Sequence, residues 1–326
     1  MPAFRILLVI LLSASSALAD NSPPRPRILG LSHIALYVHD IAKSRAFYKD
    51  FLGFAEPFSL TNDSGALRLT WIKINDRQSI ELFPEKESGS DRLYHIALET
   101  DDAERMRLYL KSKGVSVPDK TPVGKIGNFN YFVQDPDGHN VEIVQHAPNG
   151  WTVREKSNFM PETRISARMA HVGILVGNLD PALKFYVGVL GGIETWRGSK
   201  NSKELNWVNI KVPDGNDYVE FMLYPELPAS DQRGKYHHLS LEVPNIEKAK
   251  AILAGRAAAI SYTRPLEVQT GVNGKRQLNL WDPDGTRVEL MEPQTIDGVP
   301  APSSSAPPPA RHNTQGESRQ SDRTSL

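Results

Sequence analysis

The stretch LSHIALYVHDIAKSRAFYKDFLGF, from Leu31 to Phe54, has a second copy in the chain without gaps, MAHVGILVGNLDPALKFYVGVLGG, from Met169 to Gly192. The histidine near the start of each copy, His33 in the first and His171 in the second, aligns at an offset of 138 residues. Self-similarity over such a distance is typical of a duplicated structural unit. The repeat therefore predicts two similar domains in one chain.

Each copy of this stretch predicts a strand followed by a helix. Residues alternate in polarity from His33 to Val38, which is the period of a half-buried strand. Asp40 can cap a helix that ends near Gly53, and Asp180-Pro181 can start the corresponding helix of the second copy. The apolar face of the strand should pack under the helix, so the histidine face should look into a cleft.

Two further segments repeat later in each half of the chain. The segment that starts at His95 matches the one at His238 at an offset of 143, and each leads into a second strand and helix. The sequence Asp-Pro-Asp-Gly at 135–138 matches 282–285 at an offset of 147, and Val-Glu follows both. The slowly growing offset indicates small loop insertions. The pattern predicts an α+β fold of four units, each with a strand, a helix and about three more strands.

The two ends of the chain differ in composition from this repeated part. Arg5, the apolar run from Ile6 to Leu12 and the sequence Ala17-Leu18-Ala19 predict a signal peptide over residues 1–19 and an exported protein, periplasmic or secreted. The apolar run is too short to span a bilayer, so we expect no membrane attachment after cleavage. Residues 294–326 have few large apolar side chains and are predicted to be a disordered tail rich in Pro and Ser. Between these ends we expect a linker at 20–29, a domain at 30–147, a linker at 148–167 and a domain at 168–293.

Charge and cysteine content exclude several classes of function. The 38 Lys and Arg residues balance the 38 Asp and Glu residues, so no global field favours binding to nucleic acid or to anionic membranes. The chain has no cysteine, which excludes disulfides, thiolate metal sites and cysteine nucleophiles. Any metal must be held by His, Asp or Glu.

Two histidines and two glutamates recur at strand positions in each half of the chain. In both halves each acid is flanked by apolar residues, so it should project to the side of the sheet that the histidines occupy. This donor set suits a divalent metal ion such as Ni, Zn, Mn, Co or Fe. A single His or Glu on a strand is usually only a solvated side chain. Here the same four residue types recur at matching strand positions in both halves, which favours metal binding by at least one domain. The candidate metal ligands are His33, Glu81, His95, Glu142, His171, Glu220, His238 and Glu289.

These motifs resemble the vicinal oxygen chelate superfamily, which includes glyoxalase I, bleomycin- and fosfomycin-resistance proteins and extradiol dioxygenases. The resemblance implies four βαβββ modules paired into two domains, each with a curved mixed sheet around a metal. It also implies that all eight residues match the ligand positions of glyoxalase I, with Glu142 and Glu289 as the catalytic bases. In that family the metal binds two neighbouring substrate oxygens while a carboxylate moves a proton.

Two departures from the family patterns limit this resemblance. Glyoxalase I usually has an arginine four residues after its first ligand, where this chain has Tyr37 and Leu175, so a glutathione thioester is a doubtful substrate. Ring-cleaving dioxygenases usually place a His and a Tyr shortly before the final turn, where this chain has Asn273, Lys275 and Arg276.

The sequence therefore leaves three functions open. The leading hypothesis is an exported, metal-dependent isomerase or lyase of glyoxalase type that acts on a small molecule with adjacent oxygens. The second is an Fe(II) dioxygenase of catechol-like compounds that uses His171, His238 and Glu289 of the second domain. The third is a non-enzymatic protein that binds a small molecule and confers resistance to it. The substrate and the oligomeric state stay open.

Overall fold

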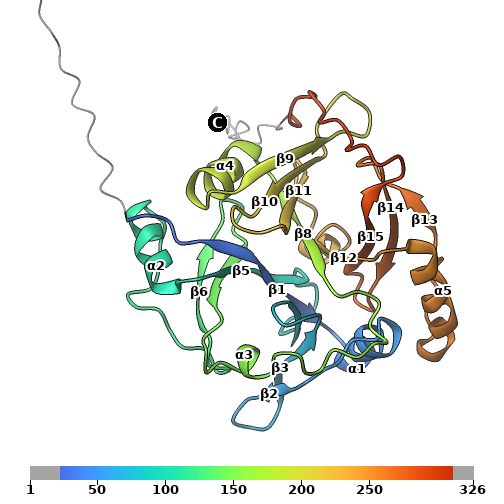
Figure 1. Cartoon of the computed structure of the whole chain (residues 1–326), viewed down its shortest axis with the longest axis horizontal. Coiled ribbons are helices and arrows are strands. Elements are labelled where there is room, and N and C mark those ends of the chain that lie inside the picture. Colours follow the sequence, from blue (N-terminus) through green and yellow to red (C-terminus); the bar gives the residue numbers. More distant parts are fainter. Residues whose placement is uncertain (1–22, 311–326) are drawn as a thin grey trace, which may run out of the picture.

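The computed structural model of this protein describes residues 23–310, which form two mixed sheets with few helices (Figure 1). Residues 28–145 build the first sheet and residues 169–295 build the second. The predicted α+β class is confirmed. The predicted signal peptide lies outside the described residues. Within residues 23–310 no helix has both the length and the apolar character that a bilayer crossing requires.

The first sheet has seven strands in the order β2-β3-β4-β1-β5-β7-β6. Strand β1 pairs in parallel with β4 and antiparallel with β5, and β5 pairs in parallel with β7. Four strands that lie far apart in the sequence are therefore neighbours at the centre of the sheet. The strands are β1 (Ile28–Val38), β2 (Ser59–Thr61), β3 (Leu67–Lys73), β4 (Ser79–Pro84), β5 (Leu93–Thr100), β6 (Phe129–Gln134) and β7 (Asn140–Gln145).

The second sheet has eight strands in the order β13-β14-β15-β12-β8-β11-β10-β9. Its four central strands repeat the pattern of the first sheet, because β8 is parallel to β11 and antiparallel to β12, which is parallel to β15. The strands are β8 (Met169–Val176), β9 (Ile193–Gly198), β10 (Trp207–Lys211), β11 (Tyr218–Leu223), β12 (His238–Glu242), β13 (Val268–Thr270), β14 (Lys275–Trp281) and β15 (Arg287–Thr295).

Three of the four units contain a strand, a helix and three more strands. The unit that starts at β5 has only β6 and β7 after its helix, with an isolated bridge between Val123 and Phe129 in place of a third strand. The helical segments are α1 (Ile41–Arg45), η1 (Ala46–Phe51), α2 (Ala103–Ser112), α3 (Trp151–Arg154), α4 (Leu179–Leu183), η2 (Lys184–Val189), η3 (Ser230–Lys235), α5 (Ile246–Ala257) and η4 (Ala258–Ile260).

Short polar side chains start the main helices. Asp40 accepts hydrogen bonds from Ala42 N and Lys43 N at the start of α1. In the second copy Asn178 caps α4, so this helix begins before the predicted Asp180-Pro181 start. This position suits the sequence, because proline fits the first turn, where its missing N–H would have no helical partner.

Both first helices continue as π-helical turns, η1 and η2, and a glycine in the left-handed region follows each. Gly53 has φ 81° and Gly191 has φ 77°. A Cβ atom on Gly53 would lie 2.1 Å from the carbonyl oxygen of Thr163. Both the backbone angle and this close approach therefore require glycine at the Leu-Gly step of the repeat.

The Asp-Pro-Asp-Gly turns connect the two halves of the molecule. Tyr48 of η1 donates its hydroxyl to Asp282 of the second half at 3.1 Å, and Tyr186 of η2 donates to Asp135 of the first half at 3.0 Å. The last aspartate of each turn also accepts a backbone N–H from the other half. His39 N donates to Asp284 at 3.0 Å. Each half therefore closes a turn of the other half through matching residues of the repeat.

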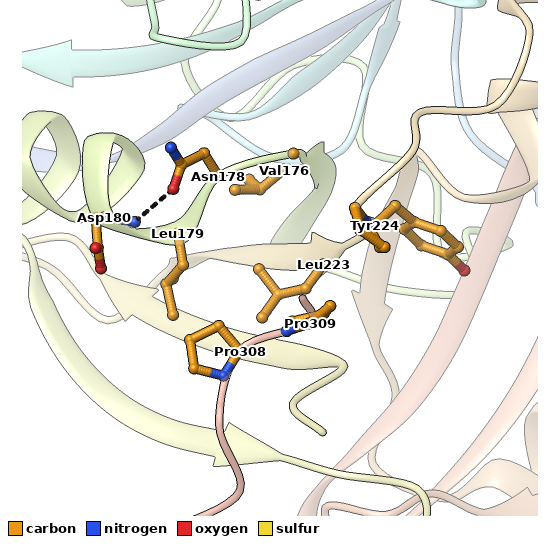
Figure 2. Close-up of a pocket in the computed structure, with 10 residues that line it drawn as sticks. Val176, Asn178, Leu179, Asp180, Leu223, Tyr224, Pro308 and Pro309 are labelled. Atoms are coloured by element: carbon orange, nitrogen blue, oxygen red, sulfur yellow. Dashed lines mark hydrogen bonds between the residues drawn. The ribbon is translucent and has the colours of Figure 1, made fainter. Parts of the chain in front are cut away.

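The described part of the predicted tail is ordered against the second sheet, which corrects the prediction of disorder for residues 294–310. Ser304 N donates to the carbonyl of Arg197 in the edge strand β9 at 2.9 Å. Pro308 and Pro309 lie beside Leu179 and Leu223 (Figure 2). Composition failed here because main-chain hydrogen bonds along a sheet edge do not need large apolar side chains.

Replacement of either cross-half tyrosine should weaken folding. Tyr48→Phe removes the donor to Asp282 Oδ2, and Tyr186→Phe leaves Asp135 Oδ2 with His139 Nδ1 alone. Each change is expected to lower the free energy of unfolding by about 1–2 kcal/mol. Denaturant unfolding followed by circular dichroism measures the loss. Unfolding midpoints equal to that of the wild type in both variants would contradict the importance of these bonds.

Candidate metal centres

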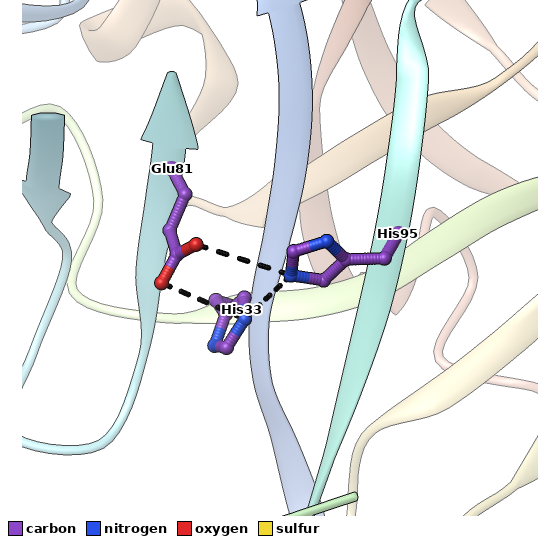
Figure 3. Close-up of side chains that lie close together, drawn as sticks. All are labelled: His33, Glu81 and His95. Atoms are coloured by element: carbon purple, nitrogen blue, oxygen red, sulfur yellow. Dashed lines mark hydrogen bonds and ion pairs between the residues drawn. The ribbon is translucent and has the colours of Figure 1, made fainter. Parts of the chain in front are cut away.

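The first centre draws one side chain from each of four neighbouring strands, β1, β4, β5 and β7. His33 Nε2 lies 2.9 Å from His95 Nε2 and 3.0 Å from Glu142 Oε2. His95 Nε2 lies 2.9 Å from the same Glu142 oxygen, and Glu81 Oε1 lies 3.6 Å from His33 Nε2. Figure 3 shows His33 and His95 turned toward Glu81. All four predicted residues of the first half therefore converge on one buried point.

The second centre repeats this arrangement, with longer distances between the two histidines and from Glu289 to each of them. His171 Nε2 lies 3.1 Å from His238 Nε2. Glu220 Oε2 lies 3.3 Å from His238 Nε2, and Glu289 Oε2 lies 3.7 Å from it. The structure thus gathers all eight predicted residues into two clusters, four in each. It also places His238 in the centre and turns the neighbouring His237 toward Asp91 of the first half, 3.5 Å away.

Small residues on the middle strands make room for these side chains. Ala35 lies opposite both Glu81 and His95 in the strand register. Gly173 lies opposite both Glu220 and His238, and a Cβ atom there would approach the His238 ring to 1.9 Å. A small residue follows two positions after each histidine. This spacing is a further sequence signal for the centres, and the repeat motifs alone do not reveal it.

The donors present fit a divalent metal ion. In each centre His, Glu and His offer ligand atoms that all lie within 4.8 Å of one another, and the second glutamate adds an oxygen beside the histidines. Imidazole nitrogens and carboxylate oxygens suit Zn, Ni, Fe, Co and Mn. Four such groups buried side by side cost free energy to desolvate, and a shared cation would offset that cost.

The electrostatics of the two centres differ in the metal-free protein. Burial alone would lower the pKa of His33, but the charges of Glu81 and Glu142 and a hydrogen bond to Glu142 raise it to about 9. In the second centre burial dominates and lowers the pKa of His171 to about 3. Burial also raises the pKa of Glu289 to about 7. At neutral pH His33 of the first centre is therefore charged, whereas His171 of the second centre is neutral.

One arginine contributes to this difference. Arg287 Nη2 lies 2.7 Å from His238 Nδ1 and 3.0 Å from His238 Nε2, and its charge lowers the pKa of His238 in addition to burial. The matching residue of the first half is Asn140, whose side chain donates to the carbonyl of Tyr94. A fixed positive charge thus covers a histidine of the second centre only.

A chain of polar groups supports the first centre from behind. A register shift in β1 between Leu31 and His33 accompanies Ser32, whose Oγ lies 3.2 Å from His33 Nδ1 and 3.1 Å from His146 Nε2. His146 Nδ1 faces Glu99 at 3.5 Å. The His146 side chain is only 9% exposed and lies beside the centre. Partners of this kind fix the ring orientation of a ligating histidine.

The second half lacks this support. Ala170 and Pro293 occupy the positions that match Ser32 and His146, and His171 Nδ1 has no hydrogen-bond partner among the described residues. Because Ser32 and His146 have no counterparts in the repeat, a search for repeated polar residues could not find them.

Comparison with known proteins agrees with this geometry. Residues 30–143 and 168–290 match the Glyoxalase/Bleomycin resistance protein/Dioxygenase superfamily, which covers more than half of the chain. The chain belongs to this superfamily. The expected family resemblance is thereby confirmed.

Relatives and solved structures within the superfamily have different activities. The chain is 25% identical over 306 residues to a lactoylglutathione lyase of Schizosaccharomyces pombe, which covers 80% of this chain and 96% of the yeast protein. It is 33% identical over 98 residues to a lactoylglutathione lyase of Arabidopsis thaliana, 30% of this chain and 29% of the plant protein. The fold resembles the 2,3-dioxygenase LapB from Pseudomonas sp. KL28, with a TM-score of 0.63, 18% identity and coverage of 86% and 98%.

The unusual pKa of His33 gives a test of the first centre. In metal-free protein His33 should stay protonated until about pH 9, and Glu142→Gln should lower that pKa because it removes a charge and a hydrogen bond. A folded-state pKa above the ordinary value of 6.5 stabilises the fold below pH 6.5, and this contribution is lost as the pH rises through 9.

Imidazole NMR spectra and unfolding curves between pH 6 and pH 10 check both parts of this prediction. Glu142→Gln should also reduce the stability lost across this range. A His33 titration near pH 6.5 that Glu142→Gln does not move would contradict it.

Proposed function

We propose that this protein is a metal-dependent enzyme of glyoxalase type, an isomerase or lyase that moves a proton within a small molecule with two adjacent oxygens. The observation that carries the proposal is the doubled cluster of two histidines and two glutamates on the four central strands of each sheet. Superfamily membership and the lactoylglutathione lyases among its relatives support this reaction class.

The histidines and glutamates would hold the metal, and the metal when bound would supply Lewis acidity to two neighbouring substrate oxygens. The His33 and His95 rings lie edge to face, with centroids 5.0 Å apart, so their Nε2 atoms point toward one position. Ser32 orients the His33 ring through Nδ1. The same roles fall to His171, His238, Glu220 and Glu289 in the second centre.

Glu142 and Glu289 are the proposed catalytic bases. One oxygen of Glu142 faces the two histidines, while the other accepts a hydrogen bond from Asn130 Nδ2 at 2.7 Å in the wall of the adjoining cavity. This carboxylate therefore lies between the donor cluster and the space for a substrate. Glu289 Oε1 is buried and has no hydrogen-bond partner among residues 23–310, so it can accept a proton.

The first cavity has a volume of about 290 Å³ and a mixed wall, in which four aromatic side chains lie among aliphatic and polar ones. Trp71, Phe83, Tyr94 and Phe132 line it, together with Arg68. This size fits a small organic molecule. An aromatic or aliphatic substituent beside the two oxygens would pack against these rings.

An Fe(II) dioxygenase that uses His171, His238 and Glu289 is the second candidate. The overall fold resembles such enzymes, and Brevibacterium fuscum homoprotocatechuate 2,3-dioxygenase gives a TM-score of 0.62 at 17% identity, with coverage of 88% and 77%. The proximity of Glu220 to His238 favours the four-donor set of the leading proposal instead. A binding protein without catalysis is the third candidate.

Metal content separates the two centres. Purified full-length protein is expected to bind up to two divalent ions per chain, and His33→Ala or His171→Ala should each remove one of them. His39→Ala is the matched control, because this exposed histidine lies outside both centres. Elemental analysis and calorimetric metal titration measure the stoichiometry. If the protein holds no metal, or if neither histidine replacement reduces it, the proposed metal centres are wrong.

Oxygen dependence separates the reaction classes. The metal-loaded protein should exchange the C–H hydrogens of dihydroxyacetone for deuterium from D₂O under anaerobic conditions. Proton NMR detects this exchange. Double replacement Glu142→Gln/Glu289→Gln should slow this exchange by on the order of 100-fold or more, because a positioned base is lost. Consumption of O₂ with catechol and Fe(II), without anaerobic exchange, would instead favour the dioxygenase. Binding without either reaction would favour the third candidate.

A further inference from the structure

The cavity beside the second centre differs in chemistry from the cavity beside the first. It has a volume of about 270 Å³, and its wall includes Lys200, Gln269, Asn273, Gln277 and Arg287. Each cavity has two cationic side chains, but the second has four amides and two aromatic side chains, whereas the first has two amides and four aromatic side chains.

Strand register shows that this difference arises at matched positions. Trp71 lies opposite Glu81 in the first sheet, whereas Asn209 lies opposite Glu220 in the second. Residues directly opposite each other in an antiparallel pair share one face of the sheet, so these side chains flank the carboxylates.

The residue opposite the other glutamate of each centre also changes from an aromatic side chain to an amide. Phe132 lies opposite Glu142, whereas Asn279 lies opposite Glu289. Two aromatic neighbours of the first centre are therefore amides in the second, and Asn140 is replaced by Arg287.

Several polar atoms around the second cavity are buried without a partner in the described part of the chain. They include Trp196 Nε1, Asn279 Oδ1, Arg287 Nε and Glu289 Oε1 of the cavity wall, and Asn209 Oδ1 from the residue opposite Glu220. Asn209 is only 8% exposed. Buried polar groups normally have hydrogen-bond partners, so this concentration indicates a missing polar ligand.

The charged side chains of the cavity indicate that the ligand has a negatively charged group. Arg287 lines the cavity, and within 4 Å it forms no ion pair with a carboxylate among the described residues. Lys200 also lines the cavity, and its Nζ lies 5.3 Å from the centroid of the Trp207 ring. Glu220 and Glu289 are the acids in this wall, and they belong to the proposed metal centre. An anionic group beside Arg287 would find a planar cationic donor, and hydroxyl groups could satisfy the amides.

We propose that the second cavity binds a small hydroxylated carboxylate whose negative group pairs with Arg287, so that the two centres accept different ligands. Use of this molecule as a substrate rests on the proposed function, but the contact with Arg287 requires no metal.

The test uses L-malate and its uncharged diamide as probes of full-length, metal-free protein. Calorimetry and the fluorescence of Trp196 and Trp207 measure binding. Malate should bind at least tenfold more tightly than the diamide, and Arg287→Asn should weaken malate binding at least tenfold. This change installs the residue that the first half has at the same position, so the fold should tolerate it. Arg287→Lys keeps the charge and should lose less affinity.

The matched control is Arg68→Gln, which removes the arginine from the wall of the first cavity and should leave malate binding unchanged. Equal affinity for malate and the diamide, no effect of Arg287→Asn, or an equal loss in Arg68→Gln would each overturn the proposal. Failure of metal binding in the separate titration would overturn the proposed enzyme but leave this anion site standing.

Discussion

The approach of two imidazole nitrogens, 2.9 Å apart in one sheet and 3.1 Å in the other, is the constraint on which both centres depend. It requires two antiparallel strands in one register, with Ala35 opposite His95 and Gly173 opposite His238. Larger residues at these positions would occupy the space of the rings. The glutamates then come from parallel neighbours on either side. The mixed topology of the sheet is thus what places two acids and two histidines on one face.

The two centres share donors but not surroundings. The first rests on Ser32 and His146 and opens to a cavity with four aromatic side chains in its wall. The second has no polar support behind His171, and Arg287 lies against its other histidine. A cation beside a ligand opposes metal binding by Coulomb repulsion unless an anion accompanies the metal. The geometry therefore makes the first centre the better preorganised of the two.

The sequence was sufficient for those features that occur twice. The fold class, the strand faces and all eight residues of the clusters follow from periodicity and from the repeat at offsets of 138, 143 and 147. Features that occur once could not be found in this way. Ser32 and His146 are 114 residues apart and meet only through tertiary packing. Arg287 resembles any polar residue of a strand until the register places it beside His238. The order of residues 294–310 depends on backbone bonds to a strand edge, which composition does not report.

The crossed bonds between tyrosines and Asp-Pro-Asp-Gly turns have a consequence for the history of the chain. Tyr48 contacts Asp282 while its counterpart Tyr186 contacts Asp135, so residue i meets j and j meets i. That reciprocity is the mark of an isologous interface between two identical subunits. The chain thus has the geometry of a symmetric dimer joined into one polypeptide. Such a fusion frees each former subunit to change its own cavity, which identical subunits encoded by one sequence cannot do.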